Sequence, residues 1–212
     1  MNNVKQIDLE SWGRYQQYLF FKDFDSPFFN LCSELEVTKL KKFCKLKNQP
    51  FFISILYESL YIANSIKEFK LRLTDDGVVE YNSIYAGSTV LNQDKNFNFC
   101  YFDYFEEFRQ FSNNAKQIIN SAKSNSYKFQ PRESEIGLLH FSTMPWVSFT
   151  SITHARNFKN NDSIPKIVFG KFYKKKKKWY LPISIEVHHA LMDGYHVGKY
   201  LKLLQNQINI SY

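Results

Sequence analysis

The side chains best suited to acid–base chemistry gather in residues 183–198, which hold three of the five histidines of this 212-residue sequence. Within this segment His189 and Asp193 form the pattern H-x-x-x-D-G. The alternating β-branched residues before His189 predict a strand, and Asp193-Gly194 predicts a turn. Apolar residues at helical spacing from Val197 onward predict a helix. A neutral imidazole held at the end of a strand can accept a proton near neutral pH, so His189 is a candidate general base.

Two other interpretations fit the same segment. A His–Asp pair at this spacing is commonly a packing and hydrogen-bonding detail without a catalytic role. A metal site would draw on His188, His189, Asp193 and His196, which lie close together in the sequence. Adjacent residues of a strand point to opposite faces, however, so His188 and His189 cannot easily reach one ion. We therefore expect no metal at this segment.

Four segments in order along the chain carry a resemblance to a known family. They are Trp12-Gly-Arg14, Phe105-Glu-Glu-Phe-Arg-Gln-Phe111, Ser142-Thr-Met-Pro-Trp-Val-Ser-Phe-Thr-Ser151 and Glu186-Val-His-His-Ala-Leu-Met-Asp-Gly-Tyr-His-Val-Gly198. Together they resemble the motifs of the chloramphenicol acetyltransferase family, within the wider H-x-x-x-D-G group of coenzyme A-dependent acyltransferases. The resemblance implies transfer of an acetyl group from acetyl-coenzyme A to a hydroxyl of chloramphenicol.

The resemblance assigns a role to each catalytic residue. His189 would be the general base that deprotonates the acceptor hydroxyl, and Ser142 would donate a hydrogen bond to the oxyanion of a tetrahedral intermediate. Ser142 lacks the G-x-S-x-G context of a hydrolase nucleophile, and the family needs no acyl-enzyme. Arg14 would turn inward to pair with Asp193 and fix the turn that presents the histidine. His188 and His196 would support the site.

The acceptor pocket matches the family only in part. Aromatic positions of the chloramphenicol site are matched by Phe21, Phe29 and Phe97. Four further pocket positions carry different residue types from the family, which has apolar, tyrosine or threonine side chains there: Ile152, His154, Asp162 and Val168. The family threonine at this position helps to hold a water near the oxyanion, and an apolar Val168 cannot do so. A second hypothesis therefore keeps the mechanism and changes the acceptor alcohol or the acyl donor.

On the donor side, Lys171 matches a lysine near the coenzyme phosphate, and Phe172 stands for a stacking tyrosine. Pro50 replaces a family lysine. Acetyl-coenzyme A would be a co-substrate, with no permanently bound cofactor. Family members are homotrimers with active sites between subunits, so the resemblance implies a homotrimer here.

Outside these motifs, the pattern predicts one domain over residues 1–212 of the α+β class, a two-layer α/β sandwich with a mixed sheet and helices on one face. Helices are expected from Asp8 to about Leu19, over 38–46, 51–65 and 104–122, and after 197. Expected strands are 28–37, 69–73, 78–81, 83–91, 96–102, 137–143, 146–154, 166–173 and 179–188, with a loop over 123–135.

The net charge of +8 raises the question of a polyanionic partner. Five of the positive charges are Lys174 to Lys178, which lie between two strand-like runs and predict an exposed hairpin tip. These lysines could assist capture of coenzyme A, and a third hypothesis is a non-catalytic trimer that binds an anion. No nucleic-acid motif, signal peptide or membrane-spanning run is evident. Three cysteines without metal-like spacing (Cys32, Cys44 and Cys100) favour a cytoplasmic protein with reduced thiols.

Overall fold

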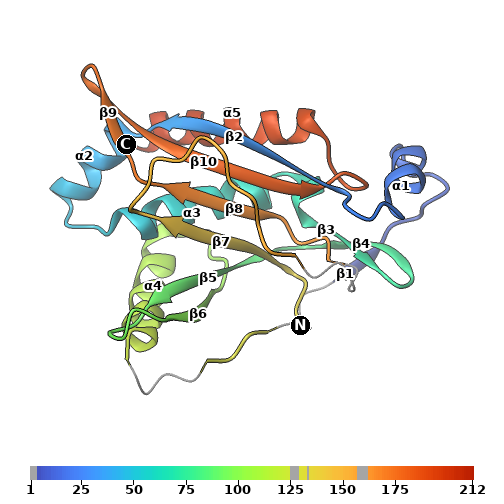
Figure 1. The fold of residues 1–212 in the computed structure, drawn as a ribbon, viewed down its shortest axis with the longest axis horizontal. Coiled ribbons are helices and arrows are strands. Elements are labelled where there is room, and N and C mark those ends of the chain that lie inside the picture. Colours follow the sequence, from blue (N-terminus) through green and yellow to red (C-terminus); the bar gives the residue numbers. More distant parts are fainter. Residues whose placement is uncertain (1–3, 125–128, 133, 157–161) are drawn as a thin grey trace.

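The computed structural model describes residues 4–124, 129–132, 134–156 and 162–212. Its elements in chain order are β1 (Val4–Gln6), α1 (Tyr15–Phe21), β2 (Phe28–Glu36), α2 (Thr38–Leu46), α3 (Phe51–Asn64), the 3-10 turn η1 (Lys67–Lys70), β3 (Leu71–Thr74), β4 (Gly77–Tyr81), β5 (Tyr85–Leu91), β6 (Phe97–Phe102), α4 (Phe108–Ala122), β7 (Leu138–Met144), β8 (Lys166–Gly170), β9 (Tyr173–Lys175), β10 (Lys178–His188) and α5 (Gly194–Ser211). Figure 1 shows a large mixed sheet with α3 and α5 behind it.

The main sheet has seven strands in the order β2-β10-β8-β7-β5-β6, with the short β9 paired to β10. Strand β7 runs parallel to both of its neighbours, β5 and β8, and the other ladders are antiparallel. A separate three-stranded sheet, β1-β4-β3, lies at one end of the molecule. The sheet is therefore mixed, as the sequence predicts.

Strand β10 shows how one sheet serves two environments. Because side chains alternate along a strand, Ile183, Ile185 and Val187 point to one face and join the hydrophobic core with α3 and α5. On the opposite face, Ser184 and the residues at alternate positions after it are polar. We call this opposite side the polar face of the sheet. In Figure 1 the segment 145–156 passes in front of it.

The helical layer is held by apolar stripes. Helix α3 buries most of its length, and α5 buries Val197, Tyr200, Leu204 and Ile208 at helical spacing. Burial of each such large side chain contributes about 1.5–3 kcal/mol. Within the described part of the chain, no helix is long and apolar enough to cross a membrane.

A buried arginine ties the small sheet to the large one. Arg72 of β3 is fully buried and donates to the backbone carbonyls of Ile136 (2.6 Å), Phe69 (2.9 Å), Leu71 (2.6 Å) and Leu138. Because Leu138 begins β7, the guanidinium links both sheets through hydrogen bonds that leave none of these carbonyls unsatisfied.

The structure corrects three sequence-based boundaries. Residues 146–154 form no strand: Trp146 and Val147 are exposed, and the segment is held by isolated contacts such as Lys171 N to Val147 O (2.8 Å) and Asn30 Nδ2 to Ile152 O (2.6 Å). The helix predicted over 104–122 begins only at Phe108. Asp8 does not cap α1, because its carboxylate accepts from Glu10 N (3.2 Å) and Ser11 Oγ (2.7 Å) in a turn before the helix.

The lysines lie in an exposed hairpin as expected, but the strand predicted over 166–173 ends at Gly170, and Lys174, Lys175 and Lys178 lie in β9 and β10. Strands β9 and β10 pair from Tyr173–Tyr180 to Lys175–Lys178, and the turn residue Lys176 has a φ of 56°. All five lysines from 174 to 178 are exposed.

Candidate active site

The turn after β10 is held by an arginine–aspartate pair. Arg14 Nη1 lies 2.6 Å from Asp193 Oδ2, and Arg14 Nη2 donates to the carbonyl oxygen of His189 at 3.2 Å. The guanidinium arrives from the residue before α1, and its side chain is 15% exposed. One side chain thus anchors both ends of the turn, at His189 and at Asp193.

Asp193 also begins α5. Its Oδ1 accepts from Tyr195 N at 3.0 Å, and its own N–H donates to His196 Nδ1 at 3.1 Å, which completes a capping box. Burial raises the pKa of Asp193, but the Arg14 hydrogen bond and the nearby charges outweigh it and hold the pKa below the usual range. Asp193 is therefore a structural anion, unsuited to accept a proton at neutral pH.

His189 sits directly beyond the end of β10, between two aromatic rings. Its imidazole stacks on Phe21 of α1 (centroids 4.1 Å, planes 4° apart) and lies tilted against Phe29 of β2 (4.8 Å). Its backbone N–H donates to Pro27 O at 2.8 Å. Nδ1 is buried without a hydrogen-bond partner among the described residues, so Nε2 is the nitrogen that a substrate can reach.

The other histidine of the tandem pair cannot serve as the base. His188 is 3% exposed, its Nδ1 accepts from Ala190 N at 3.2 Å, and burial lowers its pKa to about 4, with the charge of Arg156 acting in the same direction. The sequence-based choice of His189 over His188 is consistent with this geometry.

Ser142 lies far from His189 within one chain. It is on β7, level with Val168 of β8, which is level with Ser184 of β10. His189 is five residues further along β10, so two strand spacings and five strand residues separate them, about 19 Å. In Figure 1, β7 and β10 run in opposite directions and end at opposite ends of the sheet. A single protomer therefore does not bring the two groups together.

A cavity opens where the sheet forks beside Ser142. The β5–β7 ladder stops at Gly87–His140, whereas β5 continues along β6 to Leu91 and β7 continues along β8 to Met144. The cavity, of about 520 Å³, is lined in this fork by Thr89 to Leu91 of β5 and by Thr143 and Pro145, the neighbours of Ser142 and Met144. Because Thr89 and Val90 point to opposite faces of the sheet, the cavity spans its plane.

A second cavity of about 350 Å³ adjoins the first. The two share Phe52, Thr143 and Pro145, and the second reaches Lys171 and Phe172 after β8. Together they form a mostly apolar path from Lys171 along the start of α3 to the fork.

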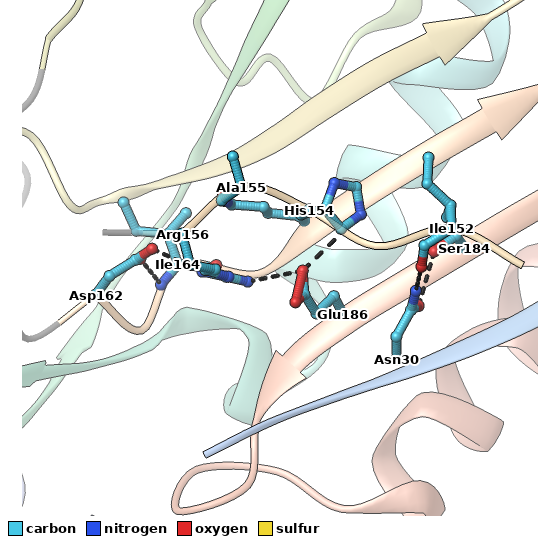
Figure 2. Close-up of polar contacts among 10 residues, drawn as sticks. Asn30, Ile152, His154, Ala155, Arg156, Asp162, Ile164, Ser184 and Glu186 are labelled. Carbon is cyan, nitrogen blue, oxygen red and sulfur yellow. Dashed lines mark hydrogen bonds and ion pairs between the residues drawn. The ribbon is translucent and has the colours of Figure 1, made fainter. Parts of the chain in front are cut away.

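Two of the expected acceptor residues, His154 and Asp162, lie in an ionic network on the polar face, and Ile152 lies on the same segment (Figure 2). Arg156 pairs with Asp162 (Nη1–Oδ2, 2.7 Å) and with Glu186 of β10 (Nη2–Oε2, 3.3 Å), and His154 Nε2 lies 3.9 Å from Glu186 Oε2. Ile152 contributes its carbonyl oxygen to Asn30 Nδ2 at 2.6 Å. None of the three lines either cavity of the fork path.

Opposite charges face one another in this network. Burial raises the pKa of Asp162, yet Arg156 and the backbone N–H of Ile164 hold it below the usual range. Burial lowers the pKa of both His154 and Lys166, and Lys166 Nζ donates to Ala155 O at 2.7 Å. Two cations and two carboxylates thus fix the segment 152–156 onto the sheet.

Sequence reasoning missed Arg156 and Glu186 as a pair. The available signal was Glu186 itself, a carboxylate within a long predicted strand, because a carboxylate that becomes buried requires a partner of opposite charge. The other expected residues divide between the two ends of the sheet: Phe21 and Phe29 contact His189, whereas Phe97 lines the fork cavity. Val168 is buried beside Ser142. The described residues contain no group of three or more potential metal ligands.

Comparison with known proteins identifies the family of this chain. The family model described as chloramphenicol acetyltransferase matches residues 1–205. The chain is 28% identical to a chloramphenicol acetyltransferase of Proteus mirabilis over 200 residues, which cover 94% of this chain and 92% of the relative. It is 29% identical to that of Staphylococcus aureus over 206 residues, covering 95% and 97%.

Solved structures agree. A chloramphenicol acetyltransferase structure superposes with a TM-score of 0.91 at 29% identity, covering 97% of this chain and all of that one. A dihydrolipoamide acetyltransferase of Azotobacter vinelandii shares the fold alone, with a TM-score of 0.72 at 13% identity and coverage of 100% and 98%.

Proposed function

From the premise that the chain belongs to the chloramphenicol acetyltransferase family, we propose how its residues carry out the family reaction. The protein is an acetyl-coenzyme A-dependent acyltransferase of the chloramphenicol O-acetyltransferase type. The observation that carries the mechanism is the division of reactive groups between the two ends of the sheet. A reachable imidazole lies at one end, and a serine beside a substrate-sized cavity lies at the other.

His189 is the general base in this proposal. Its Nε2 takes the proton of the acceptor hydroxyl while the oxygen attacks the thioester carbonyl. Stacking on Phe21 and the Arg14 bond to its carbonyl oxygen hold the ring and its backbone in place. Collapse of the intermediate breaks the carbon–sulfur bond, and the coenzyme A thiolate recovers the proton from Nε2.

Ser142 donates its hydroxyl hydrogen to the oxyanion of the tetrahedral intermediate. Loss of one such donor typically costs about 10²–10³-fold in kcat. Ser142 is next to Thr143, which lines both cavities, but its side chain points to the opposite, polar face of the sheet, as that of Ser184 does. We propose that the oxyanion forms on the polar side of the fork, within reach of this hydroxyl.

The joined cavities hold the donor. Lys171 and Phe172 at the outer end suit the phosphates and base of coenzyme A, and the apolar path toward the fork suits its long uncharged arm. The sheet opens across its plane at the fork, so a thioester that enters on the helical side can meet an acceptor on the polar face.

A complete site requires two copies of the chain. Because His189 and Ser142 lie about 19 Å apart in one protomer, the base of one copy must act with the serine and cavities of another. We propose the homotrimer that the family resemblance implies, with sites between subunits. The three unpaired cysteines, Cys32, Cys44 and Cys100, suit a reducing compartment, so we propose that the enzyme acts in the cytoplasm.

A second acceptor class has an observation in its favour. His154 and Asp162 are committed to a charged network with Arg156, and Val168 offers no hydroxyl beside Ser142. A small polar alcohol could therefore be a better acceptor than chloramphenicol.

The test is release of free thiol from acetyl-coenzyme A by the purified protein, with chloramphenicol and with a panel of alcohols. His189→Ala should abolish release and leave coenzyme A binding within about twofold, and Ser142→Ala should lower kcat about 10²–10³-fold. Full activity of His189→Ala would refute the mechanism. Turnover of other alcohols without turnover of chloramphenicol would select the second acceptor class.

A further inference from the structure

A lysine of α2 is fixed over two aromatic rings. Lys41 Nζ lies 4.0 Å from the ring centroid of Phe172 and 4.4 Å from that of Trp179. The two rings meet edge to face with centroids 5.6 Å apart, and Phe172 also meets Phe51 at 5.4 Å. The side chain of Lys41 is half-buried, so its ammonium group occupies a defined position.

This position is at the outer end of the donor path. Phe172, Phe51 and Lys171 all line the outer cavity. Phe172 lines that cavity, and the ammonium group of Lys41 lies against the ring of Phe172. The ammonium group is therefore separated from the cavity by no more than this ring. Figure 1 shows α2 and the lysine hairpin between β9 and β10 at the same end of the sheet.

Lys41 makes no ion pair with any residue that the structure describes. Other nearby lysines are engaged differently: Lys178 Nζ lies 3.4 Å from Glu36 Oε2, and Lys39 Nζ donates to Asn209 O at 2.8 Å. A ring face binds an ammonium group more weakly than a charge-assisted hydrogen bond to phosphate does. Lys41 can therefore bind an incoming phosphate while the rings still hold its hydrocarbon stem.

We propose that Lys41 binds a phosphate group of the coenzyme A donor, and that the Lys41–Phe172–Trp179 cluster selects nucleotide-bearing thioesters over truncated ones. This inference rests on the proposed function of the two cavities. The exposed lysines 174 to 178 add a positive field that draws the same anion toward this end of the molecule. The ligand chemistry is a phosphate ester, from either the pyrophosphate or the 3′-phosphate of coenzyme A.

The test compares Lys41→Met with Lys45→Met by calorimetric titration of coenzyme A into the full-length protein. Methionine keeps the unbranched apolar stem and removes the charge. Lys45 is an exposed lysine of the same helix and serves as the control. Lys41→Met should weaken coenzyme A binding about 10-fold or more, Lys45→Met should bind within about twofold, and Lys41→Arg should retain most of the affinity.

Truncated ligands identify the phosphate. Pantetheine, which lacks all phosphates, should bind the wild type and Lys41→Met equally. If Lys41→Met and the wild type also bind dephospho-coenzyme A equally, the partner is the 3′-phosphate; if the difference persists, it is the pyrophosphate.

Equal binding of coenzyme A by the wild type and a folded Lys41→Met would overturn the inference, as would an equal loss toward pantetheine. Circular dichroism and urea unfolding establish that the variant is folded. Failure of the proposed function would look different: the wild type would bind coenzyme A with the expected dependence on Lys41, yet release no thiol from acetyl-coenzyme A with any acceptor.

Discussion

Asp193 performs two tasks that two substitutions can separate. Oδ2 pairs with Arg14, and Oδ1 accepts from Tyr195 N at the start of α5. Asparagine is a good N-cap and keeps the second contact, but it removes the charge that faces Arg14. Alanine removes both. The comparison of Asp193→Asn with Asp193→Ala therefore assigns a free energy to each contact.

The expected magnitudes follow from exposure. The Asp193 side chain is 37% exposed, so solvent screens the ion pair, and we expect Asp193→Asn to lower the free energy of unfolding by about 1 kcal/mol. Loss of the cap adds about 1 kcal/mol, which gives about 2 kcal/mol for Asp193→Ala. Both variants should lose more kcat than stability explains, because Arg14 also holds the carbonyl oxygen of His189.

Equilibrium urea unfolding at pH 7 and at pH 3 is the assay, with thiol-release kinetics beside it. The folded-state pKa of Asp193 lies below its ordinary value of 3.8, so its contribution is present above that pH and is lost as the pH falls through the folded-state value. The gap between wild type and Asp193→Asn should therefore narrow at pH 3. Equal stability of the wild type and Asp193→Asn at pH 7, with unchanged kcat, would refute the role assigned to the pair.

Three further predictions follow from buried polar groups. Arg72→Met should lower the free energy of unfolding by about 3 kcal/mol or more in urea titration, because it strands the carbonyls that join the two sheets; a loss under 1 kcal/mol would contradict this. Burial lowers the pKa values of His140 and His188 to about 4 each, so only the unfolded state gains protons between pH 6.5 and 4. Stability should fall across that window by up to about 3 kcal/mol per histidine, and His188→Gln should remove about half of the slope. Arg156→Met removes the arginine that pairs with both Glu186 and Asp162 and should lower the thermal midpoint by several degrees. A midpoint equal to that of the wild type would show that these ion pairs do not contribute to stability.

The elements around His189 could be predicted because they depend on the sequence immediately around them. The strand, turn and helix around His189 follow from alternation, Asp193-Gly194 and helical spacing, and all three are present. The pairing of Arg14 with Asp193 joins residues 179 positions apart. It came only from the family resemblance, since nothing in the spacing links the two ends of the chain.

Features that depend on long-range pairing could not be predicted. Residues 146–154 alternate like a strand, but alternation does not reveal whether a neighbouring strand is free to pair. Here the side chain of Asn30 donates to Ile152 O, and that of Glu186 faces His154. The fork arises because the β5–β7 ladder ends at Gly87–His140, which no local property of either strand indicates. His154 and Asp162 were assigned to the acceptor pocket from the family resemblance, and their contacts with Glu186 and Arg156 are visible only in three dimensions.

The gap between β5 and β7 connects the two sides of the sheet. The coenzyme A thioester can approach this gap from the helical layer and the acceptor alcohol from the polar face, so neither substrate blocks access of the other. The two substrates should therefore bind in random order. Initial-rate lines plotted as reciprocals at several fixed donor levels should intersect, and either reactant alone should bind the empty enzyme.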